Sequence, residues 1–114
     1  MNKEKVLIYL EDIVDSIEKI KKYIHDMSLE DFKRNDLVQD AVLRNLEIIG
    51  EASTNLSEEI KRKHKEVPWK RMIGLRNIIS HKYFGIDLEI IWEIITVNLP
   101  GTKGLVNSIL KNHL

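Results

Sequence analysis

The chain lacks cysteine altogether, and it has no long uninterrupted apolar run among its 114 residues. Without cysteine there is no disulfide framework, no thiol nucleophile and no cysteine-ligated zinc site. Near the N-terminus, acids interrupt the apolar residues every few positions, unlike a signal peptide or a membrane span. We therefore expect a soluble cytoplasmic protein without membrane association, with residues 1–114 forming one domain.

Alternation of apolar and polar residues with a period of two is also missing, so the sequence predicts no β-sheet. Apolar residues recur at steps of three and four instead, which is the helical spacing. Two long helices are expected, from about Val6 to Ile24 and from Asn35 or Asp36 to about Leu56. The apolar seams of the two helices are Val6, Leu10, Ile13, Ile17, Ile20 and Ile24, and Val38, Val42, Leu46, Ile49, Ser53 and Leu56. The fold class is therefore all-α.

Shorter helices are predicted by capping and breaking residues. Ser28 and Ser57 are suited to cap two of them, and Pro68 is a favourable first residue for a third, which carries apolar residues as far as Ile79. Gly85 is expected to end this third helix. Asp87 is expected to cap the next helix, which runs to Leu99 before Pro100 breaks it, and a last short helix closes the chain. The apolar neighbours of Trp69 and Trp92 favour core or interface roles for both rings.

A net charge of zero conceals an uneven distribution of charge. Residues 1–60 hold eight cationic and fourteen anionic side chains, whereas residues 61–82 hold eight and one. The basic segment includes Lys70, Arg71 and Lys82, and its excess of positive charge favours a polyanionic partner such as RNA. A solvated helix face, or cations at a helix C-terminus, would give the same pattern.

The segment RNIISHKY in the basic region combines Arg76, Asn77, Ser80, His81 and Tyr83. Cleavage of a phosphodiester needs a group that exchanges protons near pH 7 and a cation that stabilises charge on phosphorus, and histidine and arginine suit these two roles. Five residues apart on a helix, the Arg and the His are rotated by roughly 140°. His81 must therefore act at a helix end or across a subunit boundary.

The second long helix carries a polar ridge formed by Arg44, Glu47, Glu51 and Asn55. Two carboxylates and an arginine could form an acid/base set. Such a ridge is more often a series of ion pairs along the helix, or a polar strip that fixes how the helix packs in a bundle or dimer. Gly50 within this helix is unfavourable relative to alanine, which suggests that another backbone passes close by.

Two blocks of the sequence resemble the HepT-type toxins of the HEPN superfamily. The first is Arg44 to Ala52, and the second combines Pro68-Trp69-Lys70, Gly74 to Asn77, His81 to Gly85, Asp87-Leu88 and Ile91-Trp92. Together with the helical pattern, the blocks cover most of the chain. The resemblance implies an antiparallel helical bundle with two long helices and three or four shorter ones, assembled as a homodimer.

The resemblance also implies a function and a partner. The chain would be a metal-independent endoribonuclease toxin without a cofactor, and Arg76 and His81 would be its catalytic pair. Its partner would be a minimal nucleotidyltransferase antitoxin that attaches AMP to Tyr83. Asn77 matches the polar residue that often follows the arginine in this family.

The chemistry of RNA cleavage gives an independent reason to expect a dimer. Without a metal, the 2′-hydroxyl of the RNA is the nucleophile, so one group must accept its proton while another protonates the leaving oxygen. His81 is the one histidine in the motif that contains Arg76, so two subunits would supply the two proton carriers. If His81 is not the base, Glu51 or Glu47 is the alternative.

Two other functions fit parts of the sequence. A non-catalytic adaptor that docks a nucleotidyltransferase, or presents a substrate to it, would have the same helices and dimer. A metal-dependent phosphohydrolase has little support, because the four histidines do not show paired ligand spacing.

Overall fold

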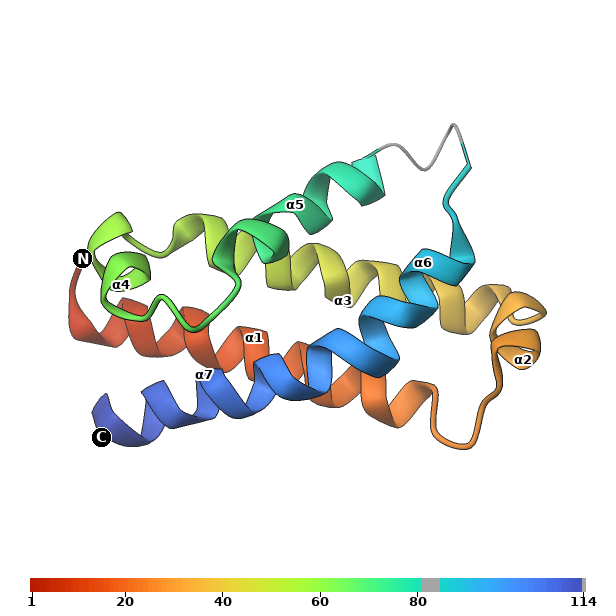
Figure 1. Ribbon diagram of the computed structural model, residues 1–114, viewed down its shortest axis with the longest axis horizontal. Helices are drawn as coiled ribbons and strands as arrows, with labels where there is room; N and C mark the ends of the chain where they lie inside the picture. The colour runs from red at the N-terminus through yellow and green to blue at the C-terminus, as the bar shows by residue number, and fades with distance from the viewer. Residues whose placement is uncertain (81–84, 114) are drawn as a thin grey trace.

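The computed structural model describes residues 1–80 and 85–113, apart from the side chains of Ser80 and His113, and helices account for most of this part of the chain (Figure 1). No strand occurs within these residues, as the sequence predicts. The elements in chain order are α1 (Lys3–Tyr23), α2 (Leu29–Lys33), α3 (Asp36–Asn55), α4 (Glu58–Lys63), α5 (Trp69–Ser80), α6 (Leu88–Glu93), the π-helical turn η2 (Ile94–Asn98) and α7 (Leu99–His113).

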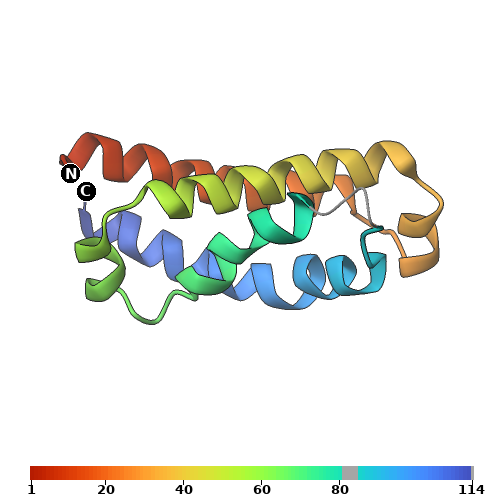
Figure 2. The same ribbon diagram turned by 90° about the horizontal axis from the view of Figure 1, so that it is seen from above.

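The long helices form an antiparallel bundle that measures 42 × 29 × 20 Å. α1 packs against α3 on one side and against α7 on another, and α5 packs against α3. Both ends of the chain lie at the same end of the bundle in the two views (Figures 1 and 2). Among the described helices, none has a stretch long and apolar enough to cross a membrane.

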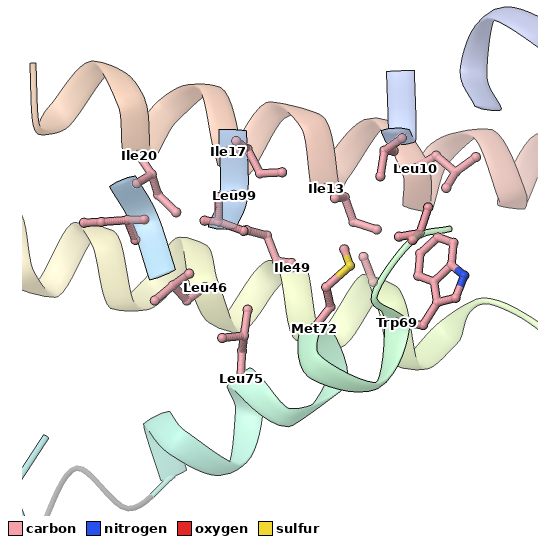
Figure 3. Packing of buried hydrophobic residues seen from close by; sticks show 14 of the residues in the cluster. Leu10, Ile13, Ile17, Ile20, Leu46, Ile49, Trp69, Met72, Leu75 and Leu99 are labelled. Atoms are coloured by element: carbon pink, nitrogen blue, oxygen red, sulfur yellow. The ribbon is translucent and has the colours of Figure 1, made fainter. Parts of the chain in front are cut away.

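The core forms where the predicted apolar seams meet. Leu10, Ile13, Leu46 and Ile49 are fully buried, and Met72 of α5 is packed with them (Figure 3). Full burial of such a side chain contributes about 1.5–3 kcal/mol, so the α1–α3 seam accounts for much of the stability of the bundle. The predicted seam of α1 is confirmed from Val6 to Ile20.

Capping residues fix where the helices begin, as the sequence predicts. Asn35 accepts a hydrogen bond from the backbone N–H of Val38, and Ser57 accepts one from Ile60. Ser28 forms a reciprocal capping box with Asp31 at the start of α2. The carboxylate of Asp87 accepts from the first turn of α6. These caps satisfy backbone donors that a helix leaves unpaired at its N-terminus.

The two tryptophans have the structural roles that their neighbours predict. Trp69 is buried, and its indole N–H donates to the carbonyl of His64 at 2.9 Å, which ties the start of α5 to the loop after α4. Trp92 packs against Phe32 with the ring centroids 5.3 Å apart. Trp69 therefore helps to set the position of α5 on α3.

The prediction that Pro100 ends a helix is wrong. The chain stays helical from Leu88 to His113, and Pro100 lies in the first turn of α7 directly after η2. In this turn the N–H of Leu99 donates to the carbonyl of Ile94, five residues back, instead of four. The wider turn removes the regular hydrogen-bond ladder at the point where proline has no N–H to donate. The last helix is consequently long, and the bundle has a third long helical segment.

Candidate functional site

A polar groove of about 690 Å³ runs along α3, between α1 and α5. The side chains that line it include Tyr9 and Asp12 of α1, Arg44, Glu47, Glu51 and Asn55 of α3, and Ile73, Arg76 and Asn77 of α5. Its volume lies in the range typical of small-ligand pockets, roughly 300–1,000 Å³. The groove therefore combines the predicted polar ridge with the arginine of the predicted catalytic motif.

The polar ridge forms one wall of the groove because its residues are three or four positions apart on α3. Arg44 and Glu47 approach each other at 3.9 Å, as expected for neighbours along a helix. Glu51 does not continue the series along α3, since its carboxylate pairs with Arg76 of α5. Ion pairing along α3 thus explains Arg44 and Glu47 of the ridge, whereas Glu51 belongs to the contact between α3 and α5.

Gly50 allows α5 to approach α3 at this point, as its place within a helix suggests. A β-carbon added to Gly50 would lie 2.7 Å from Cγ of Arg76 and 3.1 Å from the carbonyl oxygen of Met72. It would also lie 3.3 Å from the backbone nitrogen of Arg76. The prediction of a close backbone is confirmed, and the residue that passes over Gly50 is Arg76.

The guanidinium of Arg76 is held on one side by α3 and is open to the groove on the other. Its Nε lies 3.3 Å from a carboxylate oxygen of Glu51, and its Nη1 donates to the hydroxyl of Thr54 at 3.4 Å. The side chain of Arg76 remains 46% exposed. A guanidinium has five N–H donors, so this arrangement leaves donors available for a phosphate in the groove.

The described lining of the groove contains charges of both signs. Asp12, Glu47 and Glu51 contribute three carboxylates, and Arg44 and Arg76 contribute two guanidiniums. A single subunit therefore lacks, within this part of the chain, the excess of positive charge that attracts a polyanion.

The other predicted site residues fall into two groups. Asn77 lies beside Arg76 on α5 and lines the groove. Ser80 is the last residue of α5, and its side chain is not described. His81, Lys82 and Tyr83 lie outside the described residues, so their predicted roles as base, RNA contact and modification site stay predictions.

Lys70 and Arg71, predicted to contact RNA, are exposed in the first turns of α5 and do not line the polar groove. Arg71 instead lines a second, largely apolar groove of about 410 Å³ between α5 and the helices η2 and α7. If these cations meet RNA, they do so outside the groove that holds Arg76.

Sequence reasoning missed Thr54, Tyr9 and Asp12. Thr54 lies one turn after Gly50, and its relation to Arg76 depends on where α5 crosses α3. Tyr9 and Asp12 reach the groove because α1 packs beside α3. The one local signal for Thr54 is that it lies four residues after Gly50, on the same face of α3. This spacing points to Thr54 only once Arg76 is known to lie over Gly50.

Together, the fold and the groove define an all-helical bundle with an arginine of α5 set against the polar ridge of α3. The family model described as Ribonuclease HepT-like matches residues 13–109. The chain belongs to this HepT-like ribonuclease family, and the recognition made from its two sequence blocks is confirmed.

Similar proteins occur in archaea and bacteria. The chain is 41% identical over 103 residues to a protein of Thermococcus cleftensis named "Probable ribonuclease HepT", a match that covers 90% of this chain and 94% of that one. It is 42% identical over 103 residues to a "Putative RNase" of Methanocaldococcus jannaschii, with the same coverage. A "Putative RNase" of Caldanaerobacter subterraneus is 41% identical over 105 residues, 92% of this chain and 94% of its own. No solved structure matches the chain significantly.

Proposed function

We propose that this protein is a metal-independent endoribonuclease and the toxin of a toxin–antitoxin pair in the cytoplasm. The site would contain Arg76 and His81 from both subunits of a homodimer. The antitoxin would be a minimal nucleotidyltransferase that attaches AMP to Tyr83. Family membership and the names of the relatives support ribonuclease activity. The toxin role, the partner and the modification follow from the resemblance of the two sequence blocks to the HepT-type toxins.

The position of Arg76 carries the proposal. Its guanidinium lies at the edge of a groove of about 690 Å³, is half exposed, and is held from one side by Glu51 and Thr54. A cation fixed in this way needs little reorganisation when charge develops on a phosphate, which is the main electrostatic requirement of phosphodiester cleavage.

His81 would supply the proton transfers. One neutral imidazole removes the proton of the 2′-hydroxyl, which attacks phosphorus, and a protonated imidazole gives its proton to the departing 5′-oxygen. The products are a 2′,3′-cyclic phosphate and a free 5′-hydroxyl. Two His81 residues facing a shared cleft would divide these tasks, and the two Arg76 side chains would bracket the phosphate.

A second subunit would not by itself change the balance of charge in the groove, because an identical copy brings the same three carboxylates and two guanidiniums. Any excess of positive charge near the RNA would come from the cations of residues 61–82 that lie outside the groove.

Modification of Tyr83 would silence the enzyme by charge and bulk. An AMP group on the phenol adds a phosphodiester anion two residues from His81, where it repels and blocks RNA. After co-expression with the cognate transferase, mass spectrometry should find AMP on Tyr83. An unmodified Tyr83 would exclude this route, and direct blockage by the bound antitoxin would remain.

The decisive experiment measures RNA cleavage by the purified protein in EDTA. Arg76→Ala and His81→Ala should each lower the rate at least about a hundredfold, as removal of charge stabilisation or of a proton carrier does in other enzymes. Arg34→Ala and His25→Ala remove the same side-chain types from exposed positions outside the groove and should leave the rate unchanged. Undiminished cleavage by His81→Ala would refute the proposed base and leave Glu51 or Glu47 in that role.

The excess of one carboxylate in the described lining of the polar groove favours one second candidate, a non-catalytic subunit that docks a nucleotidyltransferase through basic surface groups of that partner. The same assay separates the two functions. A protein that degrades no RNA, alone or on expression in cells, would be the adaptor. Cleavage that depends on Arg76 and His81 would exclude it.

A further inference from the structure

The side chain of Arg76 lies in a seat formed by one turn of α3. Its Cγ passes over Gly50, where a β-carbon would come within 2.7 Å, and its Nε and Nη1 contact Glu51 and Thr54. The Cγ, Nε and Nη1 atoms of Arg76 therefore each have a contact on α3. Neither Thr54 nor the seat is part of the motif that predicts the catalytic pair.

The hydroxyl of Thr54 has a defined direction. It donates its one proton to the carbonyl oxygen of Gly50 at 2.9 Å. A hydroxyl that has donated its proton offers only lone pairs, so toward Arg76 it can only accept. Gly50 thus contributes twice to the seat, since its missing side chain makes room for Arg76 and its carbonyl orients Thr54.

Thr54 differs from other hydroxyls that bond back along their own helix. Thr96, Thr102 and Ser108 each donate to the carbonyl four residues earlier. Of these four residues, Thr54 is the one whose hydroxyl also accepts from the side chain of another described helix, α5. Its contact with Arg76 is therefore more than the ordinary local bond of a helical threonine.

Resting on the proposed ribonuclease function, we propose that Thr54 is a positioning residue that fixes the plane of the Arg76 guanidinium. Glu51 forms an ion pair with Nε and the hydroxyl of Thr54 accepts one Nη1 proton, which leaves both protons of Nη2 and one of Nη1 for the scissile phosphate. Fixing the plane before RNA binds reduces the rotamer freedom that Arg76 loses in the reaction. Thr54 itself touches neither RNA nor the reacting atoms.

Kinetics on a fluorophore- and quencher-labelled single-stranded RNA of mixed sequence test this role. Thr54→Val removes the hydroxyl and keeps the branched shape, and it should lower kcat about three- to tenfold with little change in KM, because the lost bond is partly exposed. Thr54→Ser restores the hydroxyl and should recover most of kcat. Thr96→Val removes an equivalent back-bonded hydroxyl outside the groove and should have no effect.

A double substitution asks whether Thr54 acts through the guanidinium. In an Arg76→Lys protein, which lacks the planar fork, adding Thr54→Val should cause no further loss of kcat. Equal kcat for the Thr54→Val and Thr54→Ser proteins, or a full additional loss in the Arg76→Lys background, would overturn the positioning role.

Nitrogen-15 NMR of the Arg76 Nε–H group tests the seat without RNA. Fast motion of this group should be restricted in the wild type and in Thr54→Ser, and should increase in Thr54→Val. Equal mobility in all three proteins would show that Thr54 does not restrain the Arg76 side chain. Absence of RNA cleavage by the wild-type protein would instead refute the proposed function, so the two failures are distinguishable.

Discussion

Replacement of Gly50 by alanine tests the contact on which the site depends. In the interior of an ordinary helix, Gly→Ala stabilises a protein by about 1 kcal/mol. At Gly50 the new methyl group would lie 2.7 Å from Cγ of Arg76 and 3.1 Å from the carbonyl oxygen of Met72. These atoms belong to the backbone of α5 or lie near it, so the steric overlap can be removed only if that helix moves away from α3.

The size of the effect follows from two opposing contributions. Overpacking of this kind costs about 1–3 kcal/mol, which cancels or exceeds the helix-propensity gain. Gly50→Ala should therefore change stability by between about 0 and −2 kcal/mol. Gly74 and Gly104 are also helical, but a β-carbon at either meets no atom within 4 Å. Their alanine variants should each be stabilised by up to about 1 kcal/mol.

The assay is urea and thermal unfolding followed by circular dichroism, at one fixed protein concentration because dimerisation would make the midpoint concentration-dependent. A gap of about 1–3 kcal/mol between Gly50→Ala and the controls corresponds to roughly 4–12 °C in Tm for a domain of this size. RNA cleavage by Gly50→Ala should also fall, because Arg76 moves with α5. If Gly50→Ala is stabilised as much as Gly74→Ala, the close approach of α5 is refuted.

Three further substitutions test the fold. Ile49→Ala should lose about 2–5 kcal/mol in urea unfolding because Ile49 is fully buried, and a loss below 1 kcal/mol would contradict its place in the core. Hydrogen bonds from the backbone and hydroxyl of Ser28 lower the pKa of Asp31, so its stabilisation is present above pH 3.8 and lost as pH falls through the lowered pKa. The Tm of Asp31→Asn should thus lie below wild type at pH 7, and the two should converge in acid. Pro100→Ala should increase the free energy of unfolding by much less than the roughly 3 kcal/mol expected in an ordinary helix interior, because η2 already accommodates the missing N–H. A gain in stability near that value would contradict this role of η2.

Much of the fold could be predicted because helix formation is governed by local chemistry. The spacing of apolar residues identified the buried face of α1, and Asn35, Ser57 and Asp87 cap helices in the structure as predicted. Pro100 was misjudged, because its effect depends on the hydrogen-bond register of the preceding turn. That register is a property of the whole packed helix and not of the proline.

The candidate site was predictable in its chemistry but not in its geometry. Arg76 and the ridge that contains Glu51 could be identified by residue type and spacing, and Gly50 indicated that a backbone lies nearby. That Arg76 is this neighbour, and that Thr54 and Asp12 border the same groove, depends on contacts between helices distant in sequence.

The sequence by itself determined where most helices begin, which faces they bury and which side chains could act on a phosphodiester, because these properties depend on residues within a few turns of one another. Only the tertiary structure decided that α5 crosses α3 at Gly50 and that Glu51 and Thr54 hold the guanidinium of Arg76. The crossing point depends on how the buried side chains of three helices fit together, and no single helix contains that information.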